Sequence, residues 1–163
     1  MSWAALIVGL VALERLIELA YAGYNTRQLV ERGAVEIGAG HYALIATLHT
    51  AWLIATFAFA PDQPLWGWIA LYLALQAARL WVILSLGPYW TTRIITLPDM
   101  PLVARGPYRF LRHPNYAVVV AEIAVLPLAF REPMVALIFS ALNLALLAWR
   151  LRIENAALME RRS

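Results

Sequence analysis

The sequence contains no cysteine and no lysine, and charged residues of either sign are scarce. Without cysteine there is no disulfide framework, no thiolate zinc site and no cysteine nucleophile. Only 14% of the 163 residues are charged and 63% are hydrophobic, with a mean hydropathy of +0.67. Soluble domains average about 25% charged and about 45–50% apolar residues. The shortage of charge therefore excludes a soluble globule and indicates an integral membrane protein, with a length that suits one compact domain.

The hydrophobic residues are gathered into five segments, which polar or proline-containing connections separate. The turn PDQP at 61–64 ends the second segment, Gly87-Pro88 closes the third, and residues 131–133 separate the last two. The last two are short for a hydrocarbon core, which needs about 20 residues, so we expect a hairpin whose ends run into the membrane interfaces. The pattern predicts an all-α integral membrane protein of about five transmembrane helices, over residues 3–22, 42–60, 66–86, 115–130 and 134–149.

Ionisable residues lie inside several of the predicted spans. Charges within the first span, and the lack of a basic residue before it, indicate a retained helix rather than a signal peptide. Glu14 and Glu18 are four residues apart and share one helix face. Since charges at membrane depth usually pair or face a cavity, we expect either glutamate to pair with Arg79, with direct substrate binding as the alternative. For Glu122 in the fourth span, a site wall and a structural polar contact both remain open.

Arginines are distributed unevenly among the connections. Cytoplasmic segments of membrane proteins carry an excess of basic residues. This rule predicts that the N-terminus lies outside and that the long loop at 89–114 and the C-terminal tail both face the cytoplasm, whereas the outer turns contain only Arg131. The arginines on the predicted cytoplasmic side are Arg27, Arg32, Arg93, Arg105, Arg109, Arg112, Arg150, Arg152, Arg161 and Arg162.

The most informative stretch is the cationic, aromatic end of the long loop, where residues 106–116 read GPYRFLRHPNY. Such a loop at a membrane surface can bind a charged, ring-bearing molecule from water. The fifth helix continues with a polar stripe of Asn143, Arg150, Glu154 and Arg161, which lie near one face of a 3.6-residue helix. Alone, Arg150 and Glu154 could be an interfacial anchor. Beside the loop, they are expected to converge with it into one site.

Other polar and aromatic residues give weaker signals. His41 and His49 are eight residues apart, and with no cysteine and no closely spaced histidine pair we expect no metal site. The basic residues are read as topology signals and site groups, so we expect no nucleic-acid partner. Trp90 fits the aromatic belt of a membrane protein, and a functional role competes with that interpretation.

Several motifs together resemble one known family. Residues 86–90 read LGPYW, 106–108 read GPY, 112–116 read RHPNY, and Arg150 is followed by ENAAL at 154–158. This pattern, over about 86–158, resembles the isoprenylcysteine carboxyl methyltransferase family, whose C-terminal half is shared with phospholipid methyltransferases. The string YWTTRII at 89–95 is similar to a small bacterial branch that is often paired with type III polyketide synthases and O-methylates alkylpyrone-type lipids.

The resemblance implies a membrane methyltransferase with S-adenosylmethionine as cofactor. It implies O-methylation of a carboxylate or acidic enol on a lipophilic substrate that enters from the bilayer, with a phospholipid N-methyltransferase or a non-catalytic membrane scaffold as alternatives. Many relatives have a second glutamate where this chain has Asn155, which disfavours amine acceptors. The implied catalytic residues are Arg150, Glu154 and Trp90, and the implied cofactor-binding residues are Tyr108, Arg112, His113, Pro114, Asn115, Tyr116 and Glu154.

The resemblance also implies an organisation for the whole chain. Residues 1–163 are expected to form a single membrane domain, in which 1–86 are a three-span scaffold. Residues 87–163 are expected to be the cofactor-binding and catalytic half, with a cytoplasmic catalytic loop, the helical hairpin and a C-terminal helix. The expected location is the bacterial cytoplasmic membrane, with the active site facing the cytoplasm.

Overall fold

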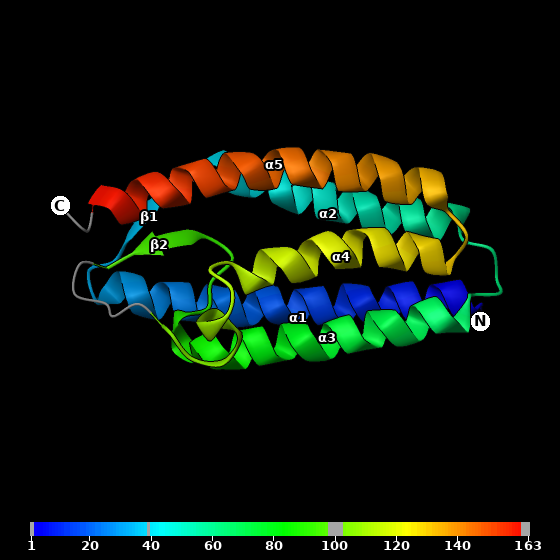
Figure 1. Cartoon of the computed structure of the whole chain (residues 1–163), viewed down its shortest axis with the longest axis horizontal. Helices are drawn as coiled ribbons and strands as arrows, with labels where there is room; N and C mark the ends of the chain where they lie inside the picture. The colour runs from blue at the N-terminus through cyan, green and yellow to red at the C-terminus, as the bar shows by residue number, and fades with distance from the viewer. Residues whose placement is uncertain (1, 39, 98–102, 161–163) are drawn as a thin grey trace.

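In the part of the chain that the structure describes, five long helices lie alongside one another in a bundle (Figure 1). The computed structural model describes residues 2–38, 40–97 and 103–160, with side chains described except at 41 and 155–160. This architecture confirms the predicted all-α membrane class. The helices are α1 (Trp3–Glu31), α2 (Gly40–Phe59), α3 (Trp66–Leu86), α4 (Pro114–Ala129) and α5 (Pro133–Glu160).

Within the described residues, three of these helices contain stretches that are long and apolar enough to cross a membrane. They are Tyr42–Phe59, Trp66–Tyr89 and Pro133–Glu154, and Pro114–Ala129 is a shorter apolar helix. The turn at 131–133 joins α4 to α5 as predicted, and Arg131 adopts a positive φ of 60° in it.

Helix ends agree with the predicted spans where a proline or glycine stops the chain. α3 covers Trp66–Leu86 and ends at Gly87, whose φ is 55°. By contrast, α1 and α5 run beyond the predicted spans, to Glu31 and Glu160. Those predicted spans ended where polar residues begin, near Asn25 and at Arg150, but the arginine, glutamate and leucine residues that follow all favour helix. Charge therefore marks where the apolar segment stops, and it does not stop the helix.

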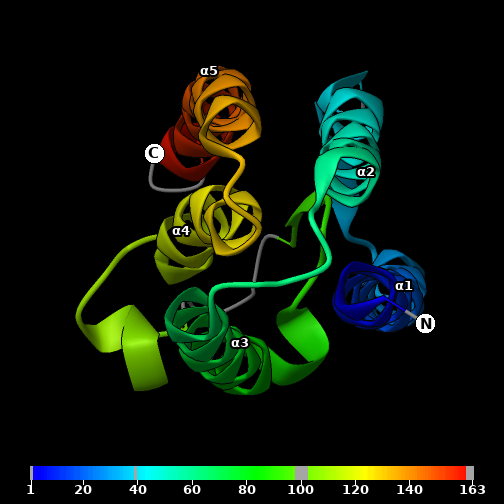
Figure 2. The same cartoon turned by 90° about the vertical axis from the view of Figure 1, so that its right-hand side faces the viewer.

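α4 lies between α3 and α5 in the bundle, as the end-on view shows (Figure 2). It packs against α3 on one side and α5 on the other, while α2 packs against α5 and α1. In the core, the indole of Trp52 on α2 is buried and its Nε1 donates to the Ile123 carbonyl of α4 at 3.1 Å. The position of α4 is thus determined by neighbours on several sides.

A small β-ribbon joins two connections that are far apart in the sequence. β1 (Val35–Ile37) pairs antiparallel with β2 (Ile94–Thr96), with Val35 opposite Thr96. Sequence patterns indicated only connecting loops here, because three residues are too few to reveal alternation. The Arg93 guanidinium beside β2 bonds the Glu36 carboxylate at 2.7 and 3.0 Å and lies 4.6 Å from the centre of the Tyr42 ring. The ribbon and the end of α5 lie at one end of the bundle, opposite the N-terminus (Figure 1).

A buried charge network connects α1, α3 and α4. Arg79 on α3 donates to both carboxylate oxygens of Glu18 on α1, and its Nη1 lies 3.0 Å from Glu122 Oε2 on α4. Arg15 adds bonds from Nη1 to Glu18 Oε2 at 2.9 Å and from Nη2 to Glu122 Oε2 at 3.1 Å. Gln76 Nε2 donates to the other Glu122 oxygen at 3.0 Å. The predicted ion pair with Arg79 is confirmed, Glu18 is its partner, and Glu122 is a structural contact.

We expect Arg79→Ala to destabilise the protein by about 3–5 kcal/mol, because Glu18 and Glu122 are then left to share the single positive charge of Arg15 inside the bundle. Denaturant or thermal unfolding in detergent micelles measures this loss. Arg93→Ala is the matched control, since it removes the partly exposed pair with Glu36 and should cost about 1 kcal/mol or less. Equal, small losses in both variants would contradict the assignment.

Candidate active site

The candidate site lies where the first turn of α4 meets the end of α5. The Tyr116 hydroxyl on α4 accepts from Arg150 Nε at 2.8 Å and donates to the Glu154 carboxylate. Arg150 and Glu154 are one helical turn apart on α5, so they present their side chains to the same neighbour. Arg150 Nη1 also donates to the Thr92 carbonyl at 2.9 Å. Among the residues that the structure describes, Arg150 Nη2 has no hydrogen-bond partner.

His113 extends this cluster at the beginning of α4. Its ring stacks on Tyr116, with the ring centres 5.2 Å apart and the planes 5° apart, and its Nδ1 lies 3.7 Å from Glu154 Oε1. Pro114 follows, and a residue before proline is disfavoured in the helical region. α4 therefore begins at Pro114 as expected, with His113 as its N-cap residue and no side chain bonded to the helix start. The positive end of the α4 dipole faces this aromatic and anionic cluster.

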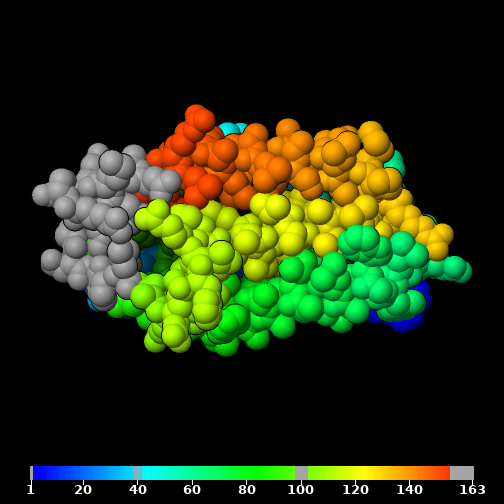
Figure 3. Space-filling model, viewed as in Figure 1, coloured from blue at the N-terminus to red at the C-terminus, as the bar shows by residue number. Residues whose placement is uncertain are grey.

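The loop before α4 brings Tyr108 toward the same cluster. The short helix η2 (Gly106–Arg109) contains this tyrosine. Burial raises the pKa of the Tyr108 hydroxyl well above its usual range, and the nearby negative charge of Glu154 adds to that rise. The hydroxyl therefore stays protonated and can donate a hydrogen bond. In the space-filling view, the chain around η2 covers the end of α3 (Figure 3).

Two contacts hold η2 against α3. Arg105 Nε donates to the Ser85 carbonyl at 2.7 Å. Gly106 adopts a φ of +58°, and a Cβ on it would lie 2.2 Å from Ser85 Oγ. Only glycine allows both this backbone conformation and so close an approach. Sequence patterns did not identify Arg105 or Ser85, because their pairing depends on how the loop folds back.

The remaining predicted site residues have different positions. Pro114 is buried in the first turn of α4, and Arg112 is exposed on the loop surface. The Asn115 side-chain oxygen is buried and has no hydrogen-bond partner among the described residues. Arg161, the last residue of the predicted polar stripe, lies outside the described residues.

Trp90 lies on the α1 side of the bundle rather than within the Arg150 cluster. Its side chain is 2% exposed and stacks on Tyr21, with ring centres 6.0 Å apart. Asn25 on α1 fixes this segment by donating from Nδ2 to the Trp90 carbonyl at 2.9 Å. Sequence patterns missed Asn25, which looks like an ordinary polar residue after the first apolar segment. Trp90 is linked to the cluster through the chain, since Thr92 accepts from Arg150.

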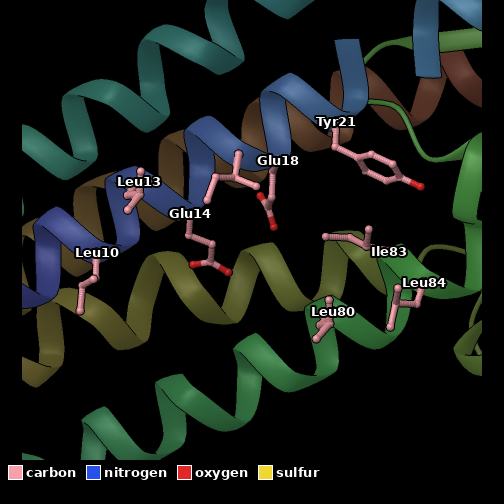
Figure 4. Close-up of a pocket in the computed structure, with 9 residues that line it drawn as sticks. Leu10, Leu13, Glu14, Glu18, Tyr21, Leu80, Ile83 and Leu84 are labelled. Carbon is pink, nitrogen blue, oxygen red and sulfur yellow. The ribbon is translucent and has the colours of Figure 1, made fainter. Parts of the chain in front are cut away.

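A cleft of about 440 Å³ lies between α1 and α3 (Figure 4). Six residues of α1, from Leu10 to Tyr21, and three residues of α3, from Leu80 to Leu84, line it. Most of these side chains are apolar, and several are more than half exposed. Tyr21 at one end of the cleft is the residue that stacks on Trp90. The cleft therefore leads from the side of the bundle toward the segment next to the candidate site.

We expect Gly106→Ala to destabilise the protein more than Gly33→Ala does. Both glycines have positive φ, at +58° and +89°, so both variants lose about 1–2 kcal/mol to backbone strain. Only the Gly106 variant also places a methyl group against Ser85, which adds about 1–3 kcal/mol of overpacking. Thermal unfolding in detergent measures both losses, and adding Ser85→Ala should recover part of the Gly106 loss. Equal losses in the two single variants would show that η2 does not pack tightly on α3.

Comparisons with known proteins identify the family of this chain. The uncharacterized protein YpbQ of Bacillus subtilis (strain 168) is 38% identical, with 98% of each chain covered. An uncharacterized protein of Haemophilus influenzae (strain ATCC 51907 / DSM 11121 / KW20 / Rd) is 27% identical, with 88% of each chain covered. No solved structure matches the chain. The model of the isoprenylcysteine carboxyl methyltransferase (ICMT) family matches residues 68–160, more than half of the sequence and all the motifs of the site, so the chain belongs to this family and membership points to membrane methyltransferase activity.

Proposed function

We propose that this protein uses S-adenosylmethionine to O-methylate a carboxylate or acidic enol of a lipophilic substrate. The single observation that carries the proposal is the cluster of Arg150, Tyr116, Glu154 and His113 at one end of the bundle. This cluster places a cation, an anion and two stacked rings beside an uncapped helix start. Family membership supports methyl transfer, and enzymes of this family generally use S-adenosylmethionine.

The residues present suit this cofactor. Glu154 offers a carboxylate for its ammonium group, and the stacked rings of His113 and Tyr116 offer the aromatic surface that adenine and sulfonium groups favour. The start of α4 suits a carboxylate, because the positive end of the helix dipole attracts anions there. The unpartnered oxygen of Asn115 provides a further acceptor in the same turn. When bound, the cofactor supplies an electrophilic methyl group.

Arg150 is the residue that best suits the acceptor. Its Nε and Nη1 are held by Tyr116 and Thr92, so the guanidinium orientation is fixed while Nη2 is left to bind an anion. A carboxylate or an acidic enol is already ionised near neutral pH, so the acceptor needs no strong base. Alignment of the acceptor and exclusion of water then supply most of the acceleration.

The rest of the acceptor is proposed to lie in the apolar cleft between α1 and α3. This cleft ends at Tyr21 beside Trp90, which gives Trp90 a role next to the reacting group and agrees with its deep burial. An acceptor could then arrive sideways from the bilayer. The arginines near the loop and the tail support a cytoplasmic location for the site, where the cofactor is made.

We expect Arg150→Ala to lower kcat/KM for an anionic lipid acceptor by about 100-fold or more, because the fixed positive group is lost. Purified protein in detergent, with labelled S-adenosylmethionine and either an alkylpyrone or phosphatidylethanolamine, provides the measurement. Arg152→Ala is the control, since Arg152 is exposed on the same helix and should leave the rate unchanged. Methyl transfer to phosphatidylethanolamine alone, or full activity of Arg150→Ala, would overturn the proposal.

A second measurement separates cofactor binding from catalysis. Calorimetry with S-adenosylmethionine should show at least about tenfold weaker binding for Glu154→Gln and for His113→Ala, because each removes part of the cofactor seat. Arg150→Ala should retain most of the affinity. A protein that binds no S-adenosylmethionine would instead be a scaffold with this fold.

A further inference from the structure

The cleft between α1 and α3 contains an acidic side chain that the proposed reaction does not use. Glu14 lines the cleft among leucine and isoleucine side chains, and its carboxylate points into the gap between the helices (Figure 4). Within the described part of the chain, it makes no hydrogen bond or ion pair. Glu18, one turn further along α1, is instead held by Arg79 and Arg15. The two carboxylates therefore have different surroundings although they share one helix face.

The charges of the buried network balance without Glu14. Its two arginines already face two carboxylates, those of Glu18 and Glu122. A further carboxylate at membrane depth is costly and commonly marks a functional site. Glu14 is attracted to Arg15 and Arg79 without direct contact, and its carboxylate is directed at a space that apolar side chains, Tyr21 and the already paired Glu18 line.

We propose that this cleft binds the alkyl chain of the acceptor and that Glu14 recognises a hydroxyl group carried within that chain. The inference rests on the proposed function and names a substrate class for it: hydroxylated alkyl chains. A hydroxyl suits Glu14 better than an ammonium group does, because a neutral group is far less costly to bring to membrane depth than a charged one. The apolar residues on both sides of Glu14 contact the methylene groups.

The position of the hydroxyl follows from helix geometry. Glu14 and Tyr21 are seven residues apart on α1, a rise of about 10 Å. An extended alkyl chain covers that distance with several methylene groups. Since Tyr21 stacks on Trp90 beside the candidate site, the reacting group lies at this end of the cleft. The hydroxyl is therefore expected near the middle of a long chain, well away from the group that is methylated.

Oleate and ricinoleate make a matched pair of probes, because they differ by one hydroxyl in mid-chain. The wild-type protein in detergent is crosslinked with a diazirine-bearing fatty acid, and the labelled peptides are mapped. We expect labels on the segments of α1 and α3 that line the cleft. Ricinoleate should displace the probe at about tenfold lower concentration than oleate, the effect of one hydrogen bond to a charged group.

Three variants test the role of Glu14. Glu14→Leu should abolish the preference for ricinoleate without weakening the binding of oleate. It should not lower the unfolding temperature, whereas Glu18→Leu should lower it. Leu16→Ala is the control, because Leu16 is exposed on α1 outside the cleft. This variant should bind oleate and ricinoleate as the wild-type protein does. Glu14→Gln should retain part of the preference, since an amide oxygen still accepts a hydrogen bond.

Each result decides the inference. Labels outside the cleft, as for lipid that only surrounds the protein, would overturn it, and so would a ricinoleate preference that persists in Glu14→Leu. Destabilisation of Glu14→Leu equal to that of Glu18→Leu would show that Glu14 is structural. Because crosslinking requires no methyl transfer, a protein that prefers ricinoleate but transfers no methyl group contradicts only the proposed function.

Discussion

The structure depends on two guanidinium groups that lie between two carboxylates inside the bundle. Arg79 and Arg15 bind Glu18 on α1 and Glu122 on α4, so these charges connect the first helix of the chain to α4. Removing any one charge would leave another uncompensated where water is scarce, which makes the set an all-or-none constraint. The network therefore determines how α1, α3 and α4 sit together, and with them the position of the first turn of α4.

The first turn of α4 carries part of the candidate site. Proline starts α4, its N-terminus faces the end of α5, and the hydroxyl of Tyr116 bridges Arg150 to Glu154. The bridge holds both charged groups in fixed positions, as the proposed binding of two separate ligands requires. The Tyr116 hydroxyl lies between Arg150 and Glu154, so these two opposite charges do not pair with each other directly. The geometry agrees with the membrane methyltransferase activity to which family membership points.

The fold also separates two kinds of access. The cluster lies where the first turn of α4 meets α5, toward the end of the bundle that carries the ribbon, and with the exposed arginines of the loop it suits a water-soluble, charged molecule. The cleft between α1 and α3 opens on a side lined by exposed leucines and suits an apolar chain. Tyr21 and Trp90 lie between the two regions. A reaction that joins a polar donor to a lipid acceptor needs this arrangement, because neither molecule dissolves well where the other arrives.

Composition and local pattern determined much of this protein by themselves: the membrane class, the helix ends at Pro114 and Gly87, and the residues around Tyr116, Arg150 and Glu154. These follow from hydrophobicity, backbone restriction and helical spacing, which act over a few residues. Tertiary structure alone decided that Arg79 binds Glu18 rather than Glu14, that Trp90 packs on α1, and that β1 pairs with β2. Helical spacing places side chains on one face, but the rotation and packing of distant helices decide which charge they meet.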